Sequence, residues 1–272
     1  DTETTMPKIS GEIFPDGDFY LTAREKEMLS MVKERFDDIV VVLNIGGIMD
    51  LSWVKNDDRI SSALLGWQGG MEGGLAMAEL LTGKGNPSGK LADTFAADVN
   101  DYPSTANFHE SFDYVNYTED IYVGYRYFET LPGAQKKVIY PFGYGLTYGD
   151  VQVTEAKVVN QVTAESDIEL EVKVENHGRE TEEVVQVYIK DTDSPLAVRN
   201  YSLCGFKRVA LQTGESKTVK FTIPNRAMMV VDEQGERHVD SKHFTLFAGV
   251  SQPDSRSKGL TGKAPVEVSV TL

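Results

Sequence analysis

The sequence has almost no cysteine, no long apolar run and no excess of basic residues. One cysteine, Cys204, excludes an internal disulfide and is typical of a reducing compartment, which favours a cytoplasmic location and leaves a secreted or periplasmic one open. No stretch approaches the roughly 20 apolar residues of a membrane helix, and no signal peptide follows Asp1. The net charge of −15 repels phosphate backbones and anionic lipids, so neither nucleic acid nor a membrane is an expected partner.

Signatures of metal and cofactor binding are also scarce. The four histidines are dispersed and have no cysteine pair beside them, which argues against a zinc site. The glycine-rich segment 69–74 lacks the spacing of a dinucleotide-binding loop, and Gly83-Lys84-Gly85 lacks the Walker A pattern. The sequence therefore predicts no metal and no cofactor.

Composition divides the chain near Gly149-Asp150. Residues 1–150 contain 24 acidic and 12 basic residues, with 17 glycines and 9 valines. Residues 151–272 contain 18 acidic and 15 basic residues, with 7 glycines and 20 valines. A glycine-rich part followed by a valine-rich part predicts two domains of different class.

The first part has the pattern of an α/β domain. Thr22 and Glu25 have the spacing of a capping box, and the uninterrupted apolar run 39–43 is typical of a parallel strand buried on both faces. The expected order is helix 22–36, strand 39–43, a strand within 60–67 and helix 71–81, with 85–150 mostly irregular. Alternation of strands and helices predicts crossover connections and a parallel sheet.

The second part alternates apolar and polar residues with a period of two. Such runs surround Val172, Val187 and Val219, and the turn signals at 176–178 and 213–214 separate them. Several short strands at this spacing predict a β-sandwich.

Three carboxylates are candidates for chemistry. Glu72 is expected at a helix start, where its charge favourably meets the helix dipole. Glu119 is explained equally well by an ion pair with Arg126. Glu12 lies in a loop between glycine and apolar neighbours, where a raised pKa would make it an acid near neutral pH.

Six segments of the first part occur in an order known from one enzyme family. They are 10–12 (SGE), 40–44 (VVVLN), 67–74 (WQGGMEGG), 86–91 (NPSGKL), 122–128 (YVGYRYF) and 141–148 (PFGYGLTY). Together they resemble the C-terminal part of a glycoside hydrolase family 3 enzyme of the bacterial β-glucosidase type. In the second part, 174–178 (VENHG), 185–188 (VQVY) and 203–209 (LCGFKRV) resemble the fibronectin type III-like domain of that family.

The resemblance implies a fold and a site. Residues 1–150 would be the C-terminal half of an α/β sandwich domain, and residues 151–272 the fibronectin type III-like β-sandwich. Glu12 would be the general acid/base of a retaining β-glucosidase that removes terminal β-D-glucosyl residues from oligosaccharides. The family continues the Gly-Glu pair with a glycine and an Asp-Arg pair, whereas residues 13–16 read Ile-Phe-Pro-Asp here.

The aspartate nucleophile of that family lies on a (β/α)8 barrel, which needs on the order of 250 residues. This chain has no room for it, so we expect a partner domain in the same or another chain, no useful hydrolysis by this chain alone, and an exposed apolar surface where the remaining half belongs. No substrate-binding residue can be assigned.

Two alternatives remain at this point. The chain is also compatible with part of a β-xylosidase or another family 3 β-glycosidase. It is further compatible with a non-catalytic carbohydrate-binding module in which tyrosines stack on sugars. The candidate rings are Tyr114, Tyr117, Tyr122, Tyr125 and Tyr127.

Overall fold

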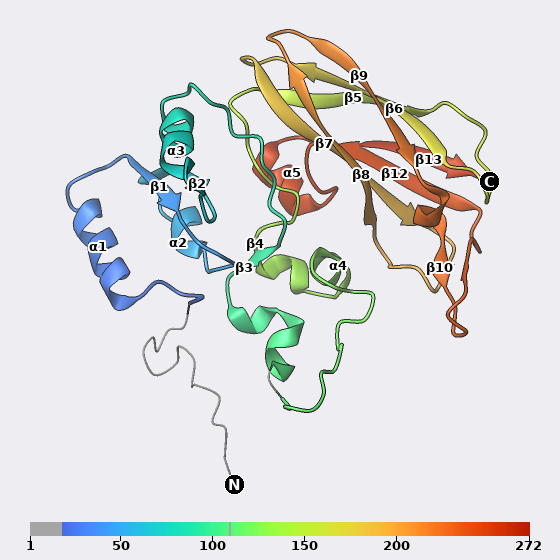
Figure 1. The fold of residues 1–272 in the computed structure, drawn as a ribbon, viewed down its shortest axis with the longest axis horizontal. Helices are drawn as coiled ribbons and strands as arrows, with labels where there is room; N and C mark the ends of the chain where they lie inside the picture. The colour runs from blue at the N-terminus through green and yellow to red at the C-terminus, as the bar shows by residue number, and fades with distance from the viewer. Residues whose placement is uncertain (1–17, 109) are drawn as a thin grey trace. The chain divides into compact units, whose positions relative to one another are not determined.

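The computed structural model describes residues 18–108 and 110–272, which form two compact units (Figure 1). The first unit contains the described residues up to Glu79 together with Phe95–Asn116. The second unit contains Leu80–Thr94 and Tyr117–Leu272. Each unit is described by itself below.

The first helix of the first unit, α1 (Ala23–Lys33), begins at the predicted capping box. The Glu25 amide donates to the Thr22 hydroxyl at 3.3 Å, while the Thr22 amide donates to the Glu25 carboxylate at 2.8 Å. Two donors that a helix N-terminus leaves unpaired are thereby satisfied. The helix ends three residues earlier than expected, at Lys33, with Glu34 as the C-cap.

The predicted parallel sheet is confirmed by strands β1 (Ile39–Leu43) and β2 (Ile60–Leu65), which pair in parallel. A short helix that the sequence did not predict, α2 (Ser52–Lys55), lies between them, and α3 (Gly73–Leu81) follows β2. The expectation that 39–43 is buried on both faces is wrong for this chain. Val40 and Val42 are 51% and 44% exposed, because no described layer covers their face of the sheet.

The stretch 85–150 is mostly irregular, as expected. Its regular elements are β3 (Phe95–Ala96), η1 (Val99–Asp101), η2 (Pro103–Asn107), α4 (Tyr125–Thr130), η3 (Ala134–Lys137) and β4 (Val138–Tyr140). Glycine and proline interrupt the chain between these elements, which keeps them short.

The predicted β-sandwich is confirmed in the second unit. One antiparallel sheet has the order β5 (Val151–Val158), β6 (Ile168–Asn176), β9 (Ser216–Ile223). The other has the order β13 (Val266–Thr271), β12 (His243–Gly249), β7 (Thr181–Asp191), β8 (Ser202–Leu211). The remaining elements are η4 (Asn225–Met228), β10 (Val230–Val231), β11 (Arg237–His238) and α5 (Ser255–Thr261).

The sandwich core follows from the alternation in sequence. Along β6, every second residue from Ile168 to Asn176 is buried. Val172 on one sheet and Val187 and Leu246 on the other have no exposed surface. Burial of apolar side chains between two sheets is the main stabilising contribution in such a domain.

Candidate active site

Glu12, the predicted acid/base, lies outside the described residues. The described segment that follows it is fixed within the first unit by two bonds. The Asp50 amide donates to the Phe19 carbonyl at 2.8 Å, and the Tyr20 hydroxyl donates to the Asp98 carboxylate at 3.1 Å. This segment is therefore held both through its backbone and through a side chain.

The carboxyl ends of β1 and β2 form the edge at which open parallel sheets bind ligands. The Gly66 amide donates to the Leu43 carbonyl at 2.8 Å, so the two strands end level with one another. Trp67 follows with φ of 50°, a left-handed backbone that costs a bulky residue about 1–3 kcal/mol. Its ring centroid lies 6.4 Å from that of Phe95, which is fully buried. The sequence placed Trp67 in a family motif, but its strained backbone was not predicted, because a positive φ ordinarily indicates glycine.

The other two candidate carboxylates, Glu72 and Glu119, have different surroundings within the described residues. Glu72 precedes α3, where its carbonyl accepts the Ala76 amide at 2.9 Å, and its side chain is exposed. Within the described ranges no salt bridge joins Glu119 to Arg126. The Arg126 guanidinium instead lies 5.9 Å from the centre of the Tyr125 ring.

The tyrosines proposed for sugar stacking have different surroundings. Tyr125 stacks on Phe142 with ring centroids 4.5 Å apart, and its hydroxyl accepts the Leu203 amide at 2.8 Å. That ring is part of the packing of the second unit. Tyr114 and Tyr117 are 57% and 90% exposed, so their rings are accessible.

The segment 86–91 binds the sandwich through Asn86. The Asn86 carbonyl oxygen accepts the Thr147 hydroxyl at 2.9 Å and the Tyr148 amide at 3.0 Å. Its amide nitrogen donates to the Glu180 carbonyl at 3.3 Å and to the Thr181 hydroxyl. One side chain thus joins the end of the segment 141–148 to the start of β7.

Lys90 forms a buried ion pair in the same region. Its ammonium lies 2.8 Å from the Glu183 carboxylate and donates to the Gly145 carbonyl at 2.6 Å. The Lys90 and Glu183 side chains are only 9% and 3% exposed. Burial lowers the pKa of Lys90 and raises that of Glu183, and the charge of each partner opposes the shift of the other. Both groups are stable as ions here only because they are paired.

Gly143 is held against β7 by a third polar contact. The Gln186 amide donates to the Gly143 carbonyl at 2.8 Å, and the Tyr188 hydroxyl donates to the Gln186 carbonyl oxygen at 2.7 Å. Gly143 has φ of 74°, and a Cβ there would stand 2.9 Å from the Tyr188 hydroxyl. Two of the segments that carry the family resemblance therefore attach to the sandwich, where they stabilise the second unit.

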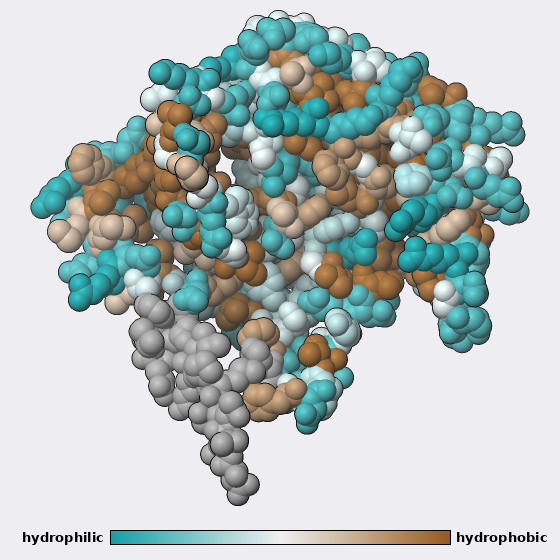
Figure 2. All heavy atoms as spheres, viewed as in Figure 1, coloured by the Kyte–Doolittle hydropathy of each residue, from teal (hydrophilic) through white to brown (hydrophobic). Residues whose placement is uncertain are grey.

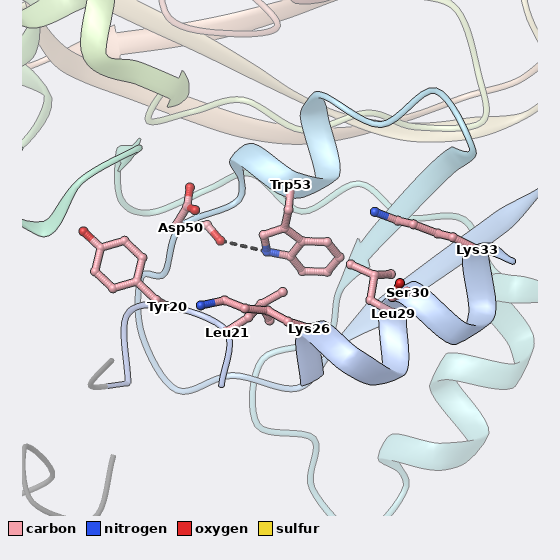
Figure 3. A pocket seen from close by; sticks show the side chains of 8 residues that line it. All are labelled: Tyr20, Leu21, Lys26, Leu29, Ser30, Lys33, Asp50 and Trp53. Carbon is pink, nitrogen blue, oxygen red and sulfur yellow. Dashed lines mark hydrogen bonds between the residues drawn. The ribbon is translucent and has the colours of Figure 1, made fainter. Parts of the chain in front are cut away.

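A pocket of about 380 Å³ lies between α1 and α2 in the first unit (Figure 3). Tyr20, Asp50 and Trp53 line one side of it, and Lys26 and Ser30 of α1 line the other. The Trp53 indole nitrogen donates to the Asp50 carbonyl at 3.0 Å, which fixes the plane of the ring.

Over the described residues, no group of three or more histidine, cysteine or acidic side chains is placed to hold a metal ion. No helix in the same ranges has the length and apolar character needed to span a membrane. Cys204 is partly buried with its Sγ 3.3 Å from the Val187 carbonyl, and burial raises the pKa of its thiol to about 12. A thiol with that pKa is unreactive at neutral pH.

Comparison with family models matches both parts of the chain. Residues 2–148 match the glycosyl hydrolase family 3 C-terminal domain, and residues 183–252 match the fibronectin type III-like domain. The second match lies within the β-sandwich described above.

The relatives that this chain matches are much longer than the chain itself. A beta-glucosidase A from Butyrivibrio fibrisolvens is 46% identical over an alignment 264 residues long, which covers 90% of this chain and 32% of that protein. An exo-alpha-(1->6)-L-arabinopyranosidase from Bifidobacterium breve is 34% identical, over 86% of this chain and 30% of that protein. The structure of a beta-glucosidase from Paenibacillus barengoltzii superimposes with a TM-score of 0.81 at 35% identity, and covers 93% of this chain and 27% of that one. The chain spans about a third of the length of the relatives it matches.

Proposed function

Since the chain belongs to glycosyl hydrolase family 3, we propose that it is the acid/base-carrying portion of a retaining β-glucosidase that removes terminal β-D-glucosyl residues from oligosaccharides. The observation that carries this proposal is the match of 90% of the chain to one third of a bacterial beta-glucosidase. In the proposal, residues 1–150 are the C-terminal half of the α/β sandwich domain, and residues 151–272 are the fibronectin type III-like domain. The nucleophile belongs to a (β/α)8 barrel that this chain does not contain.

The proposed roles follow from the chemistry of a retaining glycosidase. The barrel aspartate attacks the anomeric carbon, and protonated Glu12 donates its proton to the departing glycosidic oxygen. The Glu12 carboxylate then takes a proton from the water that releases glucose from the covalent intermediate. Retention requires the two carboxyl groups to be about 5–5.5 Å apart.

Exposed apolar side chains on the first unit support the proposal that a partner domain covers it. Large apolar side chains on and beside α1 and β1 are exposed, among them Met28 and Phe36 at 59% each and Val40 at 51%. Figure 2 shows hydrophobic surface over this part of the chain. Large exposed apolar patches in a soluble protein usually mark an interface, and the other half of the sandwich domain would cover this one.

The first test compares this chain with a complete enzyme that also contains the barrel. We expect the 272-residue chain alone to leave an aryl β-glucoside unhydrolysed, and robust turnover by the purified chain would refute the proposal. In the complete enzyme, Glu12→Gln should lower kcat on cellobiose by about 10²–10⁴-fold, because general acid catalysis is lost. Substrates with a good leaving group should recover part of the rate.

The matched control is Glu27→Gln, which removes an exposed carboxylate from the middle of α1. It should leave kcat unchanged on both substrates. If Glu12→Gln hydrolyses cellobiose as fast as this control, Glu12 is not the acid/base.

A second candidate is another glycosidase specificity, including β-xylosidase. The similarity to an exo-alpha-(1->6)-L-arabinopyranosidase supports it, because one family architecture occurs in relatives named for different sugars. A panel of nitrophenyl glycosides offered to the complete enzyme separates the candidates. The proposal of a β-glucosidase requires the highest kcat/KM on the β-glucoside.

A further inference from the structure

The walls of the pocket between α1 and α2 are fixed before any ligand arrives. The Asp50 amide is bound by the Phe19 carbonyl at 2.8 Å, and the Asp50 carboxylate accepts the Ser52 amide at 2.8 Å. The Tyr20 hydroxyl also accepts the Val99 amide at 3.3 Å. Together with the bond between the Trp53 indole and Asp50, these contacts hold the aromatic side chains in set positions. A preorganised wall lowers the entropic cost of binding.

The lining combines apolar surface with polar groups. In Figure 3 the Trp53 indole projects from α2 toward α1, and Tyr20 and Lys33 stand at opposite ends of the pocket. Leu29 adds apolar surface, while Ser30 adds a hydroxyl from an exposed helix position. The volume of about 380 Å³ falls within the range of about 300–1,000 Å³ that is usual for small-molecule sites.

The charges around the pocket favour a neutral ligand. Lys33 is already paired with the Asp57 carboxylate, and the Asp50 carboxylate accepts hydrogen bonds from the Ser52 amide and hydroxyl. The net charge of −15 on the whole chain disfavours an anion. A neutral molecule with an apolar face for the indole and several hydroxyls for the polar groups fits this lining.

We infer that this pocket is a second carbohydrate site, which binds a neutral hexopyranose unit of a glucoside against Trp53. The choice of a glucoside rests on the proposed function, whereas the site itself is separate from Glu12 in its residues and in its test. Its ring face would stack on the indole, and a hydroxyl of the sugar would meet the Ser30 hydroxyl.

Tryptophan fluorescence offers a direct test, because the chain has only Trp53 and Trp67. In the Trp67→Phe variant of the 272-residue chain, Trp53 is the sole reporter and lies in the pocket. We expect cellobiose, and more weakly glucose, to change its emission with saturation. In the Trp53→Phe variant, where Trp67 is the sole reporter, we expect no saturable change.

A second variant tests the pocket without removing its tryptophan. Ser30→Phe, introduced in the Trp67→Phe background, fills the pocket from an exposed position and should raise the Kd for cellobiose at least about tenfold. Its matched control is Met28→Phe on the opposite face of α1, where Met28 is 59% exposed. That control should bind as the background does. An equal Kd for both variants would overturn the inference.

Two further outcomes would also overturn it. One is a fluorescence change that rises linearly with cellobiose and never saturates. The other is tighter binding of glucose 6-phosphate than of glucose, which would make the pocket an anion site. Ser30→Phe in a complete enzyme should leave kcat on an aryl glucoside unchanged. If the Trp67→Phe chain shows no saturable sugar binding while the complete enzyme hydrolyses the aryl glucoside, only the second site is rejected. If the chain binds sugar saturably while the complete enzyme does not hydrolyse the aryl glucoside, only the proposed enzyme function is rejected.

Discussion

A buried carboxyl group in the second unit should make its stability depend on pH. Glu129 lies in α4, where Gln135 donates to its carboxylate at 2.9 Å. Burial is the main cause that raises the pKa of Glu129 to about 7, and the negative charge of nearby Asp254 adds to it. Asp254 is itself 6% exposed and accepts the Ser257 amide at 2.8 Å at the start of α5. We expect replacement of Glu129 by glutamine to remove this dependence.

The sign follows from proton linkage. The folded chain holds the Glu129 proton up to about pH 7, whereas the unfolded chain releases it near the ordinary value of 4.5. Protonated Glu129 therefore stabilises the fold fully below about pH 4.5, and this contribution is lost as the pH rises through about 7. The shift corresponds to about 3 kcal/mol if the side chain is fully shielded, and to about 2–3 kcal/mol with its partial access to solvent.

Urea unfolding at about pH 5 and about pH 8 measures the effect. Between these two values the free energy of unfolding of Glu129→Gln should rise relative to the unchanged chain by about 2 kcal/mol, because glutamine has no proton to lose. The matched control is Glu72→Gln, whose carboxylate is exposed. That variant should follow the unchanged chain at both pH values.

A carboxyl ¹³C titration by NMR checks the cause independently. The Glu129 signal should titrate near pH 7, well above the signals of exposed glutamates. A midpoint near 4.5, or an identical pH dependence of unfolding in Glu129→Gln and the unchanged chain, would refute the reasoning from burial and from the Asp254 charge.

Two further substitutions test how the sandwich is anchored. Lys90→Met leaves Glu183 buried without its counter-charge and should lower the free energy of unfolding by about 3–5 kcal/mol, whereas adding Glu183→Leu should recover most of the loss in urea unfolding. Gly143→Ala places a Cβ against Gln186 and Tyr188 at a positive φ, and should lower the midpoint of thermal unfolding by the equivalent of about 1–3 kcal/mol. An unchanged midpoint in either variant would mean that the contact contributes nothing to stability.

Local patterns were sufficient to predict several of the regular elements. The capping box at Thr22 and the alternation along β6 each depend on residues within a few positions, and both occur where the sequence indicates. Helix α2 was missed because it has four residues and no side-chain cap at its N-terminus. Whether Val40 is buried depends on which residues pack over its face of the sheet, and no local sequence pattern contains that information.

The side-chain contacts of the candidate site were harder to predict from the sequence than the fold. The family motifs drew attention to Asn86 and Lys90, but their partners on β7, Thr181 and Glu183, lie more than 90 positions away, and spacing along the chain cannot identify such pairs. The backbone conformation of Trp67 was missed for a different reason, since it is one that its residue type disfavours. The role of Glu12 stays a prediction until the experiments above are done.

The attachment of Asn86 and Lys90 to β7 limits how this family can be recombined. A chimera joined near residue 150 would take Thr181 and Glu183 from one parent and their partners from the other. If the parents differ at Lys90 or Glu183, the remaining charge would then be buried without its partner. Taking Leu80–Thr94 and Tyr117–Leu272 together from one parent would keep these pairs intact. The unit of exchange is therefore discontinuous in sequence, and crossover points belong beside Leu80, Thr94 and Tyr117.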